Sequence, residues 1–385
     1  MDTTATARPR QIRPASAAAP SLRPMSETGC PDAEHPAAWL TRMRSEVART
    51  LDEFVRARCH EHLAAPETVV LGQVIGDFVA GGKYLRSAFH LAGWASVAPI
   101  GPVAVRAAAS AELLHSFALM QDDVMDESAR RRGAPAAHIR FTKWHEQQGF
   151  SGSSSRFGES AAILAADLCL VWAEQLLRES GADPAALNRT MPRYDAMRSE
   201  LAVGQFRDLV NESRRSPTLT DVLAVARAKS GNYTVRRPLE LGAEMAGAAP
   251  DVLAALGGYG DAIGEAFQLR DDVLGLVGDP HTTGKPVGDD IRARKATSVL
   301  VLARVGADHA VRRELTQLDA LPEPGEQDIA RYLRMVEETG AVRRAEILIE
   351  HRVRQGLATL SLVDMPPPAR AVLTHLAHLC TDRAH

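Results

Sequence analysis

The chain has 385 residues, of which 45% are hydrophobic, so it is long enough to bury a large core. Its formal net charge is only -3, from 45 Lys and Arg against 48 Asp and Glu, which excludes a globally positive surface that would attract nucleic acid. The four cysteines lack the paired spacing of a zinc or redox site, and we expect a reduced, cytoplasmic setting.

The first part of the chain differs in composition from the rest. Residues 1–36 are rich in Ala, Pro, Ser, Thr and Arg, so we predict a disordered tail without the apolar core of a secretory signal. Residues 37–385 are expected to form one domain. The nearest candidate for a membrane span, residues 161–173, is short and interrupted by Asp167. We therefore expect no transmembrane segment.

Apolar residues three and four apart, between Gly, Pro and Ser breaks, predict helices from Ala37 onward. Convincing strands are absent. The predicted helices cover, in chain order, about residues 36–62, 66–78, 86–94, 102–127, 158–178, 193–211, 220–244, 251–276 and several shorter pieces between 293 and 380. Many long helices with no sheet to divide them favour a single, all-α helical bundle.

The helix predicted at 102–127 carries an acidic cluster near its end, Asp122-Asp123-Val124-Met125-Asp126. Carboxylates four residues apart lie on one helix face, so Asp122 and Asp126 can share a magnesium ion, which prefers oxygen ligands. A lone pair of this kind is more often a solvated acidic face. Here the preceding residues, 113–120, are largely apolar, and carboxylates in such surroundings need a cation to offset desolvation.

A second acidic cluster, Asp271-Asp272-Val273-Leu274-Gly275, lies in the helix predicted at 251–276. Gln268 precedes Asp271 by three residues and shares its face. A helix cap or a surface patch is the structural alternative. We favour a functional role because the cluster lies away from the start of the helix.

Basic residues occur beside both clusters and predict a diphosphate as the substrate. The segment Gly81-Gly82-Lys83-Tyr84-Leu85-Arg86 offers backbone amides and two cations to an anion. Each of the other cations alone is more often an exposed side chain, and together they would form a basic ring: Arg130-Arg131-Arg132, Lys229, Lys285 and Lys295.

Seven segments in this order resemble the trans-prenyltransferases of the polyprenyl synthetase family, the short-chain isoprenyl diphosphate synthases: GGKYLRS, ELLHSFALMQDDVMD, RRG, GQFRD, KSGNY, FQLRDDVLG and GKPVGDD. The resemblance covers about residues 75–300 of the chain. The resemblance implies a helical bundle of the isoprenoid synthase type with a central active-site cavity, and a homodimer.

The resemblance also assigns roles to individual residues. It implies that isopentenyl diphosphate is bound by Lys83, Arg86, His115 and Arg132. It places Arg131, Lys229, Ser230, Gln268, Lys285 and Lys295 at the allylic diphosphate, with Lys229 among the catalytic residues. It makes Asp122, Asp126 and Asp271 the ligands of three Mg²⁺ ions, with Asp123 and Asp272 in supporting positions.

The chain departs from the family pattern at two of these places. Gly275 stands where the second cluster usually ends in Asp, and Ser230 replaces the usual Thr. Ala118 leaves room for a growing chain and Phe117 is a partial barrier beside it, which in the family is typical of a geranylgeranyl diphosphate synthase.

Other activities remain open at this point. A farnesyl or other chain length is the first alternative. A class I terpene cyclase and a noncatalytic partner subunit are less favoured, because the chain keeps Lys83, Arg86 and both acidic clusters.

Overall fold

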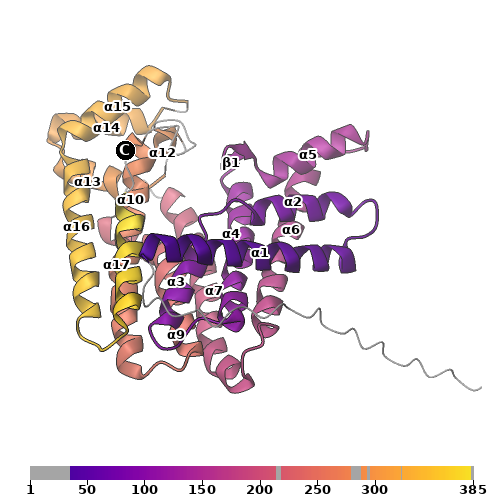
Figure 1. The fold of residues 1–385 in the computed structure, drawn as a ribbon. Coiled ribbons are helices and arrows are strands. Elements are labelled where there is room, and N and C mark those ends of the chain that lie inside the picture. The colour runs from indigo at the N-terminus through magenta and orange to yellow at the C-terminus, as the bar shows by residue number, and fades with distance from the viewer. Residues whose placement is uncertain (1–34, 214–217, 279–287, 293–294, 322, 383–385) are drawn as a thin grey trace, which may run out of the picture.

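The computed structural model of the chain describes residues 35–213, 218–278, 288–292, 295–321 and 323–382. Within them the secondary structure is helical apart from one small hairpin, so the predicted all-α fold is confirmed (Figure 1). The helices are α1 (Pro36–His62), α2 (Val69–Val79), α3 (Leu85–Ala95), α4 (Pro102–Met125), α5 (Ala137–Gln147), α6 (Ser154–Arg178), α7 (Pro184–Ser213), α8 (Leu219–Ala226), η1 (Arg227–Arg236), α9 (Arg237–Met245), α10 (Pro250–Val277), α12 (Asp289–Arg292), α13 (Ser298–Gly306), α14 (His309–Asp319), α15 (Glu326–Glu338), α16 (Ala341–Leu360) and α17 (Pro367–Thr381). The hairpin pairs β1 (Arg130–Arg131) with β2 (Ala134–Pro135) in antiparallel register. The tail predicted for residues 1–36 lies almost entirely outside the described residues.

The predicted helices agree with the observed ones except in three places. Helix α7 begins at Pro184, before the predicted start at 193, because it continues through Pro192. The helix predicted over 220–244 is divided into α8, η1 and α9, and η1 is a ten-residue π-helix. Helix α5 was not predicted, and neither was the hairpin, whose two-residue strands give no periodic signal.

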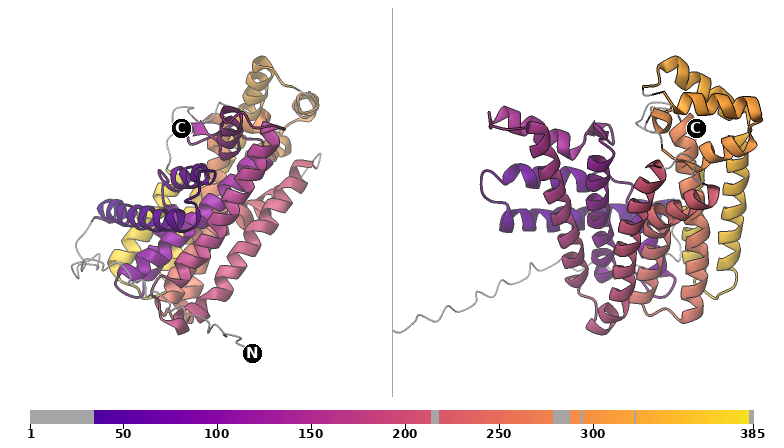
Figure 2. Two further views of the ribbon diagram at one scale, coloured as in Figure 1. Left: turned by 90° about the vertical axis from the view of Figure 1, so that its right-hand side faces the viewer. Right: turned by 180° about the vertical axis from the view of Figure 1, so that it is seen from behind.

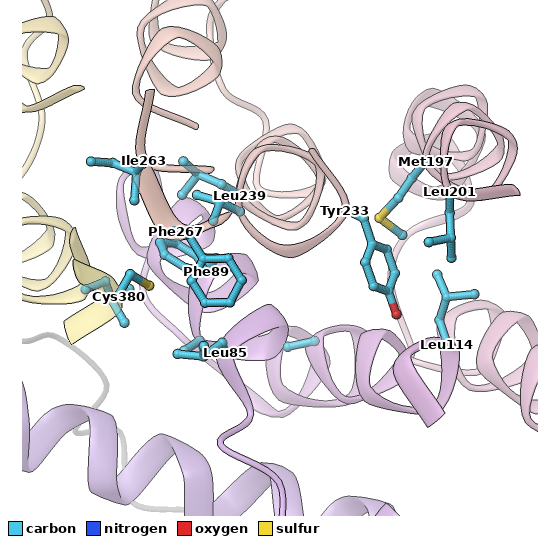
Figure 3. Close-up of a cluster of buried hydrophobic side chains, with 14 of the residues drawn as sticks. Leu85, Phe89, Leu114, Met197, Leu201, Tyr233, Leu239, Ile263, Phe267 and Cys380 are labelled. Carbon is cyan, nitrogen blue, oxygen red and sulfur yellow. The ribbon is translucent and has the colours of Figure 1, made fainter. Parts of the chain in front are cut away.

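One continuous hydrophobic core runs through the bundle from Trp39 in α1 to Cys380 in α17. Helix α4 packs against α6, and α10 packs against α16 and η1. In Figure 3, Phe89 and Phe267 meet in this core. The two helices that carry the acidic clusters are therefore held by packing along most of their length.

The arrangement in space puts α4 and α10 inside the bundle. Helix α16 lies on one side and α6 on the other, with α4 and α10 between them (Figures 1 and 2). The last turns of α4 and α10 carry the acidic clusters. The hairpin β1–β2 follows α4 directly, and α12 is the next described element after α10.

Two helices, α4 and α6, are long and apolar enough to cross a membrane, judged by length and composition alone. In α4, 67% of the apolar window is buried inside the fold, and in α6 44% is buried. Core helices of a folded domain meet the same criterion, and α4 contributes a long row of residues to the core. The expected absence of a transmembrane segment stays a prediction.

Candidate active site

A cavity of about 420 Å³ opens between α4, α7 and η1. Five of the predicted site residues, from three separate segments of sequence, line it: Arg86, His115, Asp122, Lys229 and Ser230. The rest of its wall is mainly apolar and includes Phe117, Ala118, Leu201, Phe206 and Leu209. The cavity therefore has a charged part, suited to an anion, next to an apolar part.

Asp122 lies among cations at the charged part of this cavity. The Lys229 ammonium is 3.1 Å from Asp122 Oδ1 and 2.6 Å from Asp208 Oδ2. An Arg131 guanidinium nitrogen is 3.3 Å from Asp122 Oδ2. Burial raises the pKa of Asp122, but attraction to Lys229, Lys295 and Arg131 outweighs it and holds the pKa below its usual value. Asp122 is therefore an ionised carboxylate at neutral pH.

Asp126, one turn later, is paired with a residue from the other half of the chain. Lys295 Nζ lies 2.6 Å from Asp126 Oδ2. Burial lowers the pKa of Lys295, but attraction to Asp126, with smaller contributions from Asp122 and Asp290, raises it above its usual value. Lys295, which follows α12 in the chain, thus brings a positive charge to the first acidic cluster.

Asp123, between these two residues, points into the protein. It is 0% exposed and accepts hydrogen bonds from Arg131, one of them from Nε at 2.8 Å. Burial raises the pKa of Asp123, and the Arg131 guanidinium offsets part of this effect. Asp123 fixes the hairpin that carries Arg131 against the end of α4.

The second acidic cluster is divided in the same way. Asp272 is buried and accepts hydrogen bonds from Ser298 N at 2.8 Å, Ser298 Oγ at 2.6 Å and Gln268 Nε2 at 2.8 Å. Burial raises the pKa of Asp272 to about 6, although these hydrogen bonds act in the opposite direction. Asp271 is only partly buried. Asp272 therefore links α10 to the start of α13. The side-chain amide of Gln268, predicted to bind the allylic diphosphate, donates its hydrogen bond to Asp272.

Two of the residues predicted to bind isopentenyl diphosphate, Arg86 and Arg132, lie near His115. Arg86 stacks over the ring of Tyr233 at 4.3 Å, and the His115 and Tyr233 ring centroids are 6.2 Å apart. Arg132 donates hydrogen bonds to the carbonyl oxygens of Phe78 and Ala80, which shortly precede Lys83 in the chain. Burial, followed by repulsion from Arg86, Arg132 and Arg131, lowers the pKa of His115 well below its usual value. His115 is therefore neutral, with its cationic neighbours supplying the charge.

Comparison with known proteins decides the family. The family model described as polyprenyl synthetase matches residues 68–337. The chain belongs to the polyprenyl synthetase family. Membership makes it a prenyltransferase of isoprenoid synthesis.

Individual relatives of this family differ in their products. The chain is 31% identical to a geranylgeranyl diphosphate synthase of Mycobacterium tuberculosis, over 84% of this chain and 92% of the relative. It is 33% identical to a (2E,6E)-farnesyl diphosphate synthase of Mycobacterium bovis, over 73% of this chain and 74% of the relative. A crystal structure of the Corynebacterium glutamicum geranylgeranyl pyrophosphate synthase, complexed with isoprenyl diphosphate and magnesium, is 36% identical, with a TM-score of 0.85 over 90% of this chain and 99% of that one. The isoprenoid synthase type of bundle is thus confirmed.

The carboxylates fit magnesium by their chemistry. Among the described residues, no group of three or more His, Cys, Asp or Glu side chains lies close enough to hold a metal ion. Mg²⁺ in such enzymes is bound by one or two carboxylates together with waters and substrate phosphates, so a complete protein cage is not required. Asp122 and Asp126 already face ammonium groups, which shows that their surroundings suit a cation. Lys285, also predicted for this site, lies outside the described residues.

Three further residues of this polyprenyl synthetase site were missed by the sequence analysis. Asp208 shares Lys229 with Asp122, and Gln205 Nε2 lies 3.4 Å from Asp122 Oδ1. Gln205 and Asp208 are three residues apart in the GQFRD segment, which places both on one helix face. This spacing could have identified them as site residues from the sequence. Tyr233 lines the cavity, and its ring lies beside Leu114 and Leu201 in Figure 3.

The π-helix η1 explains how Lys229, Ser230 and Tyr233 reach the same cavity. A Cβ at Gly204 of α7 would lie 2.7 Å from the Lys229 backbone nitrogen, so the two backbones approach closely here. On the other side of η1, a Cβ at Gly231 would lie 3.0 Å from the carbonyl carbon of Gly264 in α10, so these two backbones also approach closely. The segment is therefore fixed between two helices, and a wide helical turn of this kind is common at functional sites.

Proposed function

We propose that the chain is a magnesium-dependent trans-prenyltransferase that condenses isopentenyl diphosphate with an allylic diphosphate to give a short-chain isoprenyl diphosphate, with geranylgeranyl diphosphate as the main product. One observation carries the proposal. Arg86, His115, Asp122, Lys229 and Ser230, which come from separate parts of the sequence, line one cavity that also has an apolar wall.

The allylic diphosphate is assigned to the end of the cavity formed by the acidic clusters. Lys229, Lys295 and Arg131 lie around Asp122 and Asp126 and would stabilise the charge that develops on the departing oxygens. Magnesium ions held by Asp122, Asp126 and Asp271, three in number when substrate is bound, would supply the further positive charge that makes diphosphate a good leaving group. The Ser230 hydroxyl lies next to Lys229 as an additional hydrogen-bond donor.

Isopentenyl diphosphate is assigned to the cations around His115. Arg86 and Arg132 offer fixed guanidinium groups for its phosphates, with Lys83 from the preceding turn, and the neutral His115 can donate a hydrogen bond without adding charge. The two substrates would then lie side by side, and proximity supplies much of the rate. The bond forms between the substrates themselves, so no protein nucleophile is needed. The apolar wall excludes water from the reactive carbocation.

Chain length is assigned from the apolar part of the cavity. Phe117 and Ala118 lie on its wall one turn before Asp122. The small Ala118 leaves space for a lengthening tail and Phe117 limits it, which supports a twenty-carbon product over a fifteen-carbon one.

A homodimer is proposed on the outer face of α6. Leu164 and Val171 of this helix are 61% and 60% exposed. They are seven residues apart and so lie on one face of the helix, and exposed apolar side chains on one face are typical of an interface. We infer that the occupant is a second copy of this chain. Light scattering should give twice the chain mass, and a Leu164→Glu/Val171→Glu variant should shift toward the monomer; a monomeric wild type would contradict the proposal.

The activity is tested with the purified chain, isopentenyl diphosphate, Mg²⁺ and each allylic primer in turn, followed by chromatography of the products. We expect a product only when both substrates and Mg²⁺ are present, with geranylgeranyl diphosphate dominant. Release of diphosphate from an allylic substrate alone, with a hydrocarbon product, would favour a terpene cyclase. Absence of turnover with every primer would favour a noncatalytic partner subunit.

A further inference from the structure

The π-helix η1 has one set of side chains at the cavity and another in contact with α7. Its Lys229, Ser230 and Tyr233 line the cavity. The side-chain amide of Asn232 has a different partner, because it donates a hydrogen bond of 3.2 Å to Glu200 Oε2 of α7. One side of η1 therefore serves the cavity, and another is attached to the neighbouring helix.

The Glu200 carboxylate binds a second residue at the end of η1. It accepts a hydrogen bond from Nε of Arg237, the first residue of α9, at 3.0 Å and forms an ion pair with the same guanidinium. Burial raises the pKa of the Glu200 carboxyl, but hydrogen bonding and attraction from Arg237, with a further hydrogen bond from Asn232, hold the pKa below its usual value. Glu200 and Arg237 both lie outside the seven sequence segments that carry the family resemblance.

The spacing of the two partners of Glu200 matches a π-helix. Asn232 and Arg237 are five residues apart, and the Arg237 backbone N–H donates to the Asn232 carbonyl oxygen, which is the five-residue hydrogen bond of a π-turn. On a regular α-helix, residues five apart point about 140° away from each other. A carboxylate that binds both side chains therefore stabilises the wide turn relative to an ordinary helical one.

Helix α7 contacts η1 at three points that lie one turn apart. Glu200, Gly204 and Asp208 follow each other at intervals of four residues and share one face of α7. Glu200 binds the end of η1, the Gly204 backbone approaches that of Lys229, and Asp208 Oδ2 lies 2.6 Å from Lys229 Nζ. A change at the first contact would therefore be transmitted along η1 to the lysine.

We propose that Glu200 is a positioning residue, which holds η1 in its wide-turn conformation and so places Lys229 at the cavity. Loss of the carboxylate should let the segment relax toward α geometry and rotate Lys229 relative to Asp122. The consequence for turnover rests on the proposed function, because Lys229 is assigned there to the allylic diphosphate. The hold on η1 does not depend on that assignment.

Hydrogen exchange of the ligand-free full chain, followed by mass spectrometry, tests the hold on η1. Glu200→Gln keeps the shape of the side chain and removes its charge. Peptides that cover residues 227–237 should exchange about tenfold faster in this variant, because hydrogen bonds to a charged group are lost. Exchange at the wild-type rate would overturn the inference.

A matched control is available in another pair of helices. Glu314 of α14 has a side chain that is 33% exposed, against 29% for Glu200, and it forms an ion pair with Arg331 of α15. Glu314→Gln therefore removes the same charge from a similar interhelical pair. It should leave both the exchange of residues 227–237 and the turnover as in wild type.

A double-mutant cycle tests whether Glu200 acts through Lys229. Glu200→Gln should lower kcat/KM for the allylic diphosphate about 10- to 100-fold, the usual cost of a small misplacement. In a Lys229→Ala background the same change should lower kcat/KM by less than about threefold, because the group that it misplaces is already absent. Losses that multiply in full would indicate a general structural effect and would overturn the inference.

The two experiments separate this inference from the proposed function. A wild-type chain that forms no product with any primer would refute the proposed function, while hydrogen exchange would still decide whether Glu200 holds η1. An active chain whose Glu200→Gln variant keeps the wild-type kcat/KM would refute the positioning role and leave the proposed function standing.

Discussion

The two acidic clusters use their adjacent aspartates for different purposes. In α4 the inner residue, Asp123, holds Arg131, and Asp122 faces the cavity. In α10 the inner residue, Asp272, holds Ser298, and Asp271 stays partly exposed. Neighbouring residues on a helix point about 100° apart, so a pair of aspartates supplies one outward and one inward carboxylate. Each cluster therefore combines an outward carboxylate, which we propose as a metal ligand, with an inward one that fixes its surroundings.

The clusters differ one turn further along. The first continues with Asp126, which pairs with Lys295, and the second continues with Gly275, over which the Asp290 carboxylate lies. The first cluster therefore has a third carboxylate one turn further along, and the second has a glycine there, with a side chain of α12 lying against it.

The largest expected effect comes from the outward carboxylates. Asp122→Ala and Asp271→Ala should each lower kcat about 100- to 1000-fold, because charge on the leaving diphosphate is no longer neutralised. Circular dichroism should show unchanged helix content. Asp364→Ala, an exposed residue between α16 and α17, is the control and should keep full turnover. Near-normal turnover in either cluster variant would refute its metal role.

The inward carboxylates should affect stability more than chemistry. Asp123→Ala leaves Arg131 largely buried without its main partner and should lower the free energy of unfolding by about 3 kcal/mol. Asp272→Ala leaves a buried Ser298 amide and hydroxyl and should cost about 2 kcal/mol. Urea unfolding of the metal-free protein measures both values. If both variants unfolded like wild type, the division into inward and outward roles would be wrong.

The smallest effect should come from the cavity wall beside the first cluster. Phe117→Ala should change the stability little, because the side chain is only partly buried, and should lengthen the product by at least one five-carbon unit. Product chromatography with a farnesyl diphosphate primer measures the change. Phe150→Ala, an exposed aromatic residue near α6, is the control. An unaltered product distribution would place the limit of the cavity elsewhere.

The sequence predicted the helices and the clustered charges because both depend on short-range spacing. Asp122 and Asp126 could be placed on one face from their separation alone. The π-helix could not be predicted, since the glycines that pack closely against it, Gly204 and Gly264, lie outside the segment and far apart in the chain. The position of Asp290 was hidden for the same reason: its relation to Gly275 exists only after α12 packs on α10.

The wide turn of η1 limits how this segment can evolve. A π-helix holds more residues per turn than an α-helix, so loss of one residue between 227 and 236 would restore ordinary α geometry and rotate Lys229 relative to Tyr233. Exchanges that keep the residue number, such as Ser230 for Thr, leave the backbone path intact. A deletion within this segment should therefore disturb the cavity more than an exchange that keeps the number of residues, such as Ser230 for Thr.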